Sequence, residues 1–82
     1  MAIKTEQIRP GCCYSNGEFG QKWFVWQVAE VFIGENNIEM VRYRILVGVN
    51  RRKYQSVSQE EFVKKVRYEV ELMESTWQRV VD

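Results

Sequence analysis

The chain has 82 residues, of which 45% are hydrophobic and 13% aromatic, and its formal net charge is +1. This length predicts a single domain, 1–82, and the apolar content excludes a disordered chain. The longest apolar runs are far shorter than the roughly 20 residues that cross a bilayer, and the first ten residues lack the apolar centre of a secretory signal, so we expect a cytoplasmic protein without a membrane segment.

The N-terminal part of the chain predicts a loose segment followed by a β core. Residues 1–10 are mixed polar and end in a Pro-Gly turn signal, so we expect 1–10 to be a lead-in and 11–57 to form the core. A short strand is expected over 12–15. The Asn-Gly pair at 16–17 then predicts a flexible connection, because both residue types tolerate positive φ.

Two adjacent cysteines, Cys12 and Cys13, lie in that first strand. A disulfide between neighbours requires a distorted peptide, so we expect reduced thiols that face opposite sides of the strand. The chain has no histidine and no second cysteine pair, and two thiols alone cannot complete a tetrahedral zinc site. We therefore expect no metal and no cofactor.

The middle of the chain predicts a long β-hairpin. Residues 22–33 and 38–48 are dense in β-branched and aromatic residues, and 34–37 supplies turn chemistry. In the second arm the core face is expected to hold Val41, Tyr43, Ile45 and Val47, because side chains alternate between the faces of a strand. If Asn36-Asn37 is the two-residue turn, four opposed pairs follow: Phe32 with Val41, Glu30 with Tyr43, Val28 with Ile45, and Trp26 with Val47.

The remaining segments predict one more strand, a helix and a C-terminal element. A basic turn at 48–53 leads into a strand over 54–57. Ser58, followed three residues later by Glu61, matches a capping box, so we expect a helix over 58–67. Its apolar stripe would comprise Phe62, Val63 and Val66. Beyond it 66–72 alternates as a strand does, although helical spacing also continues; we favour a strand, and 68–82 is interpreted as a C-terminal strand or tail.

These elements predict a mainly β fold with one short C-terminal helix, in the form of a small, partly open barrel of four to five strands. The chain resembles a small uncharacterised bacterial family with an SH3-like barrel pattern, through Gly11-x-x-Tyr14, Trp23-x-Val25-x-x-Val28-Ala29-x-Val31, Val41-x-Tyr43-x-x-Leu46 and Phe62. It lacks that family's usual histidine after the second strand and has an additional C-terminal stretch. The resemblance implies the fold alone, because SH3-like barrels serve many functions.

Enzymatic chemistry finds little support in the sequence. The usual nucleophile–base pairs need histidine, which is absent, and the glycines form no phosphate-binding motif, so we expect neither an enzyme nor a small-molecule substrate. Glu30 is the most interesting acid, because the predicted register places it beside Tyr43 on the apolar face. The alternative is a structural role at the rim or an ion pair with Arg42 or Arg44.

The charge distribution suggests a working surface. Residues 40–58 contain five basic residues and no acidic one, while the remaining basic residues are interspersed with all the acids. The candidate binding surface comprises Arg42, Arg44, Arg51, Arg52, Lys53 and Tyr54. Such a surface can follow a phosphate backbone while an aromatic ring stacks on a base, and Lys64, Lys65 and Arg67 would extend it. A solvated face that blocks aggregation of strand edges is the alternative without a partner.

An apolar patch supports protein recognition instead. Trp23 or Phe24 must face away from the core of a regular strand, and together with Val25, Ile33 and Met40 it would form an outward apolar patch. From these features we predict a noncatalytic binding or adaptor module that acts through protein contacts, as a homodimer or with another protein. The alternative is a nucleic-acid-binding accessory protein that uses the basic hairpin and loop.

Overall fold

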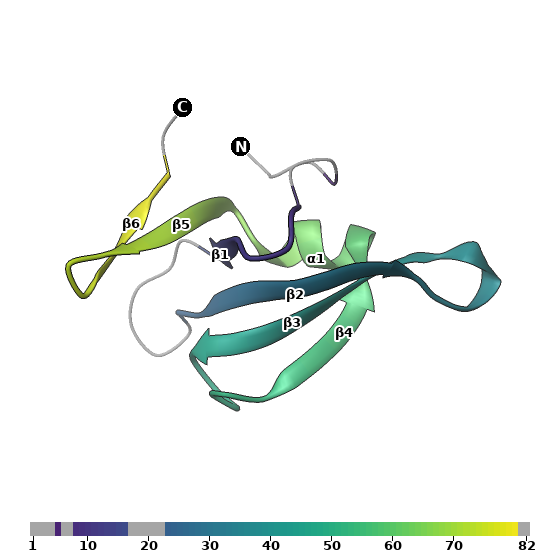
Figure 1. Ribbon diagram of the computed structural model, residues 1–82, viewed down its shortest axis with the longest axis horizontal. Helices are drawn as coiled ribbons and strands as arrows, with labels where there is room; N and C mark the ends of the chain where they lie inside the picture. The colour runs from purple at the N-terminus through teal and green to yellow at the C-terminus, as the bar shows by residue number, and fades with distance from the viewer. Residues whose placement is uncertain (1–4, 6–7, 17–22, 81–82) are drawn as a thin grey trace.

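The computed structural model describes residues 5, 8–16 and 23–80, which form one antiparallel sheet with a single α-helix (Figure 1). Six strands are described. In chain order, the elements are β1 (Cys13–Ser15), β2 (Val25–Ile33), the 3-10 turn η2 (Glu35–Asn37), β3 (Glu39–Val47), β4 (Tyr54–Ser58), α1 (Gln59–Lys65), β5 (Tyr68–Met73) and β6 (Thr76–Arg79). Their order across the sheet is β4-β3-β2-β1-β5-β6.

The mainly β class with one short helix is confirmed, but the prediction of four to five strands is too low. The residues expected to form a strand or tail at the C-terminus fold into the β5–β6 hairpin, which pairs with β1 and extends the sheet. The sheet is open, with β4 and β6 at its two edges, so the SH3-like barrel is not confirmed. The hairpin turn was not evident, because Glu74 and Ser75 take the positive φ values usually supplied by Asn or Gly.

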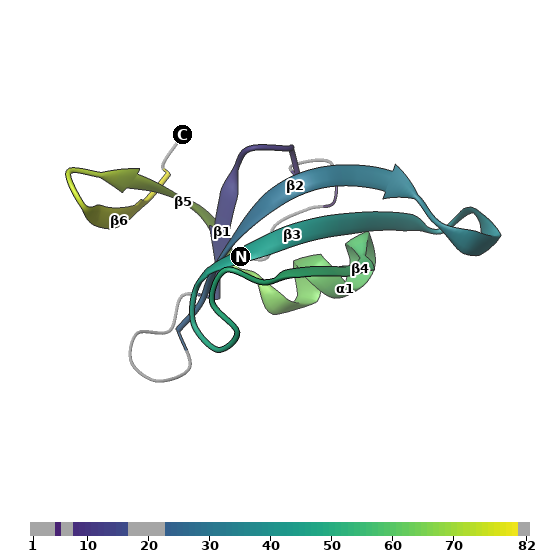
Figure 2. The ribbon, with the colours of Figure 1, turned by 60° about the horizontal axis from the view of Figure 1, so that its bottom comes forward.

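The helix begins where the capping box predicts and covers one face of the sheet. The Ser58 hydroxyl oxygen accepts a hydrogen bond from the Glu61 backbone N–H at 3.2 Å, which satisfies one of the unpaired donors of the first turn. The helix ends at Lys65 rather than at 67, because Val66 is already extended. Figure 2 shows α1 lying across β3 and β4. The Phe62 ring of α1 packs against the buried rings of Trp26 and Tyr43, so this is the side of the sheet that holds the core.

The hydrophobic core lies between α1 and the face of the sheet that it covers. Phe62 from α1 is fully buried, and its ring contacts three aromatic rings from three different strands at centroid distances of 5.5 to 5.8 Å. These are the rings of Tyr14, Trp26 and Tyr43. The expected core face of the second hairpin arm is confirmed, because Val41, Tyr43 and Ile45 are buried and Val47 is partly buried.

The predicted register of the β2–β3 hairpin is wrong. The observed pairs are shifted by one residue near the turn and by two residues at Val28 and Trp26. The connection is a three-residue loop, closed by a hydrogen bond from Gly34 N–H to the Ile38 carbonyl at 2.8 Å. A bulge at Ala29 then shifts the pairing again. As a result, Val31 lies opposite Val41, Val28 opposite Tyr43, and Trp26 opposite Ile45, with Glu30 opposite Arg42 and Phe32 opposite Met40.

Because of the bulge, Glu30 lies on a different face of the sheet from the one predicted. An extra residue between Val28 and Glu30 turns the carboxylate to the face away from the helix, where it lies 3.9 Å from the Arg42 guanidinium. The expected alternative of an ion pair with Arg42 is therefore confirmed, and the position beside Tyr43 is wrong.

Within the described residues, no helix has the length and apolar character needed to pass through a membrane.

Replacement of Phe62 by alanine should lower the free energy of unfolding by about 3 to 5 kcal/mol, because the ring is fully buried and the cavity left behind cannot collapse completely. Urea denaturation followed by circular dichroism measures this change. The matched control is Leu72→Ala on exposed β5, which should change stability by less than about 0.5 kcal/mol. Equal losses for the two variants would show that α1 does not cover the core.

Candidate functional site

The outward face of β3 and β4 brings three of the six predicted surface residues together. Arg44 and Tyr54 are directly opposed in the sheet, and Arg42 lies two residues along on the same face. The guanidinium carbon atoms of Arg42 and Arg44 lie 4.8 and 5.9 Å from the centre of the Tyr54 ring. These distances correspond to cation–π contacts, so the ring and the two cations form one composite surface.

Part of the positive charge on this surface is already neutralised. Glu30 contacts Arg42 at 3.9 Å, although both side chains are about half exposed, so the pair is weak and easily exchanged for another partner. The Nε atom of Arg44 is buried and has no hydrogen-bond partner among the described residues. Arg44 is thus held by packing against its neighbours rather than by a hydrogen bond from this nitrogen.

The other three predicted residues, Arg51, Arg52 and Lys53, lie in the β3–β4 loop. Two backbone hydrogen bonds fix this loop: Arg52 N–H donates to the Ile45 carbonyl at 2.7 Å, and Ile45 N–H donates to the Lys53 carbonyl at 2.9 Å. All three side chains are exposed, and none forms an ion pair within the described part of the chain. We refer to Arg51, Arg52 and Lys53 as the basic loop.

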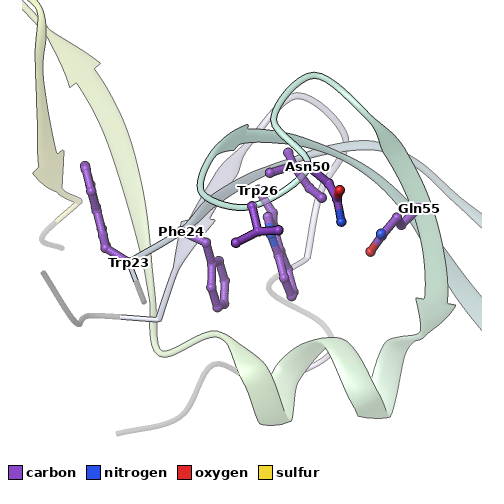
Figure 3. Close-up of a pocket in the computed structure, with 7 residues that line it drawn as sticks. Trp23, Phe24, Trp26, Asn50 and Gln55 are labelled. Atoms are coloured by element: carbon purple, nitrogen blue, oxygen red, sulfur yellow. The ribbon is translucent and has the colours of Figure 1, made fainter. Parts of the chain in front are cut away.

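A cleft of about 320 Å³ opens beside the basic loop (Figure 3). It lies between the start of β2 and the β3–β4 connection. Most of its surface is aromatic or aliphatic, and two amide side chains complete it. The lining residues are Trp23, Phe24, Trp26, Ile45, Val49, Asn50 and Gln55.

One wall of the cleft is part of a stack of aromatic rings. The Phe24 and Trp26 rings are stacked at a centroid distance of 3.9 Å, and Trp26 stacks on Tyr43 at 4.4 Å. Phe24 precedes Trp26 by two residues and lies just before β2, whereas Tyr43 lies opposite Val28, two residues beyond Trp26. The two partners therefore cover opposite faces of the Trp26 indole.

The opposite wall is held close to β2 by a glycine. Gly48 has φ +115°, and a Cβ atom at this position would lie 3.2 Å from both the Phe24 Cβ and the Trp23 carbonyl oxygen. A side chain here would face both a strained conformation and a close contact. Glycine thus lets the β3–β4 connection approach the start of β2 and form the narrow cleft.

The predicted outward apolar patch does not exist as one surface. Val25 is fully buried, Phe24 packs against the core, and Met40 is partly buried. Val25 is buried in the middle of the sheet, between Ser15 of β1 and Val47 of β3. Ile33 remains 61% exposed, but at the far end of the β2–β3 hairpin.

Sequence reasoning missed the cleft itself. Alternation predicts that Trp23 and Phe24 face opposite ways but does not say which of the two faces outward, and it gives no sign of a cleft beside them. The sequence predicts only a turn for the glycine-containing connection at 48–50 and a strand for the segment that contains Gln55. A usable signal was present in Gly48-Val49-Asn50, where an apolar residue lies in a polar turn.

A second recess lies on the side of the sheet away from α1 and contains Cys13. It measures about 460 Å³ and is lined in part by Gln27, Leu72 and Trp77. Both cysteines are free and partly buried, and Cys12 is packed against the core. Burial raises the pKa of the Cys13 thiol to about 11, with smaller contributions from the nearby Cys12 and Glu69.

Comparisons with protein-family models, curated proteins and solved structures find no match for this chain. Among the described residues, no group of three or more Cys, Asp or Glu side chains is placed to hold a metal ion. The site is therefore defined by its own geometry: a mostly apolar cleft whose residues Val49 and Asn50 lead directly into the basic loop, and an outward surface of two arginines and a tyrosine on β3 and β4.

The raised pKa of Cys13 predicts slow alkylation. Since the thiolate is the reactive form, a thiol with a pKa of about 11 is almost entirely protonated at pH 8 and gains reactivity only as the pH approaches 11. In a Cys12→Ser variant, iodoacetamide labelling measured by mass spectrometry should be at least about tenfold slower for the folded protein than for the same protein unfolded in urea. Equal rates at pH 8 would contradict the burial of this thiol.

Proposed function

We propose that the protein is a noncatalytic binding module that acts through protein contacts, including contacts between copies of this chain. The observation that carries this proposal is the position of the exposed aliphatic side chains at the ends of two protruding hairpins. The first pair, Ile33 and Ile38, lies at the β2–β3 end, and the second, Leu72 and Met73, lies at the β5–β6 end.

The two hairpin ends lie at opposite ends of the molecule, whose longest extent is 40 Å (Figure 1). Ile33 and Leu72 are 61% and 58% exposed, so each hairpin end places aliphatic surface in water. Such surface gains free energy when a partner covers it, by about 25 cal/mol for each Å² removed from water. Apolar groups at protruding ends are accessible to another chain.

The edges of the open sheet support the same proposal. β4 and β6 each have one side without a neighbouring strand in the described structure, and their unpaired N–H and C=O groups can pair with a strand of another chain. β6 carries the partly buried Trp77 beside the exposed Leu72 to which it is paired. The SH3-like barrel expected from the sequence stays a prediction for the β1–β4 region, and the proposed function does not depend on it.

A second candidate function, nucleic-acid binding, is favoured by the cation–π surface and the basic loop. Arg42, Arg44 and Tyr54 lie on one face of the sheet, and the three loop cations follow in the adjoining connection. The net charge of +1 and the Glu30 contact with Arg42 weaken the field that a polyphosphate would meet. For this reason protein contacts are the first proposal.

Light scattering tests the protein-contact proposal directly. From micromolar to near-millimolar concentration, the apparent mass should rise above the 9.8 kDa of one chain and should change little between low and high salt, since the contacts are apolar. The double variants Ile33→Ser/Ile38→Ser and Leu72→Ser/Met73→Ser should each lower this mass. Val49→Ser, at an 80% exposed position away from both hairpin ends, is the control and should leave it unchanged. A strictly monomeric wild-type chain would rule out the proposal.

A fluorescence titration with single-stranded and duplex oligonucleotides tests the second candidate. The loop variant Arg51→Ala/Arg52→Gly/Lys53→Ala uses glycine at 52 because that residue has φ +73°. If the loop contacts phosphates, the variant should bind more weakly, and its log–log salt dependence for a single strand should be shallower by about 2. Unchanged affinity in the loop variant would end the nucleic-acid interpretation.

A further inference from the structure

We propose that the cleft beside the basic loop binds an acidic peptide segment, which inserts an apolar anchor while the loop cations hold its carboxylates. This site is separate from the two hairpin ends. It goes beyond the contacts proposed above, since a chain that never self-associates still has the cleft and the basic loop that follows it in the chain.

The walls of the cleft suit an apolar anchor. Trp26 is nearly buried, and its two ring faces are covered by Phe24 and Tyr43, so a flat base cannot insert on either face of this indole. A ligand instead contacts the ring edges together with Val49 and Ile45. Aromatic-lined grooves of this kind are used to bind extended, proline-containing peptides, whose rings and aliphatic side chains fill such spaces.

The two amides supply polar contacts for a peptide backbone. The Tyr43 hydroxyl donates to the Oε1 atom of Gln55 at 2.9 Å, which fixes the orientation of the amide and leaves its Nε2 group as a donor. Asn50 lies on the same side of the cleft, and Figure 3 shows both amides near the aromatic wall. An extended peptide presents carbonyl oxygens at regular intervals, so it can accept hydrogen bonds from such donors.

The basic loop, which follows two lining residues of the cleft in the chain, favours a ligand with negative charge. Val49 and Asn50 line the cleft and lead directly into Arg51, Arg52 and Lys53, whose side chains are exposed. No acidic residue occurs between positions 40 and 58, so no carboxylate within this segment compensates these three charges. Carboxylates next to an apolar anchor are complementary to these neighbouring cations.

The cleft is preformed rather than assembled by the ligand. The Gly48 approach to Phe24 and the backbone hydrogen bonds between Ile45 and the basic loop hold the two walls in place. A rigid site loses little conformational entropy on binding, which favours recognition of a short segment. We therefore expect a peptide of a few residues to be sufficient.

A tryptophan fluorescence titration with the peptide EEPFPEE tests the proposal. Two of the three tryptophans, Trp23 and Trp26, line the cleft, and the peptide contains none, so saturable quenching or a spectral shift reports occupancy. The loop variant Arg51→Ala/Arg52→Gly/Lys53→Ala should bind about tenfold more weakly, as three exposed charge contacts predict. Val49→Ser should reduce affinity by about fivefold, through lost apolar contact.

Matched controls separate the site from general charge effects. Arg9→Ala/Arg79→Ala removes two positive charges elsewhere, and Ile33→Ser removes an exposed aliphatic group at a hairpin end; neither should change the affinity for the peptide. The peptides KKPFPKK and EEGGGEE should bind much more weakly, since the first reverses the charge and the second lacks the anchor. Circular dichroism of each variant confirms that the fold is retained.

Three outcomes would overturn the proposal. The first is the absence of saturable binding by EEPFPEE, and the second is equal binding of EEPFPEE and KKPFPKK. The third is that an oligothymidine binds the cleft more tightly than the peptide and loses that affinity in Val49→Ser, which would assign the cleft to nucleic acid. A monomeric mass in light scattering bears only on the hairpin contacts, so failure of either proposal can be recognised separately.

Discussion

The position of the Trp26 indole between Phe24 and Tyr43 is the contact on which the rest of the structure depends. The same ring packs against Phe62, so it joins the start of β2, the centre of β3 and the helix that covers them. Aromatic stacking and the burial of large rings are among the strongest contributions available to a domain of this size. The cleft results from this packing, because it lies at the end of the aromatic stack, where Phe24 meets the β3–β4 connection.

Local patterns were sufficient to predict most of the elements. Alternation identified the core face of β3, and the capping box placed the start of α1 at Ser58, because both signals depend on neighbouring residues in the chain. The bulge at Ala29 was not predictable, since no glycine or turn residue marks it, and it changed the partner of Glu30. The β5–β6 hairpin was missed for a similar reason: Glu74-Ser75 gives no conventional turn signal.

In the candidate site, the residues of the β3–β4 surface could be predicted from local sequence patterns, whereas the cleft could not. Arg42, Arg44 and Tyr54 could be expected on one face, because strand parity fixes the first two and the hairpin register brings the third opposite. The cleft could not be expected, since it requires the β3–β4 connection to fold back on the start of β2, about 25 residues earlier in the chain. Contacts of this kind depend on the complete fold rather than on any periodicity.

The shortest strand, β1, has a consequence for the way the molecule opens. Its three residues are the only link within the described sheet between the helix-covered strands and the β5–β6 hairpin. Loss of a few backbone hydrogen bonds at this junction releases the hairpin while the packed aromatic core stays intact, as in subglobal unfolding. A released hairpin can take the same place in a second molecule, so this junction makes the fold susceptible to domain swapping.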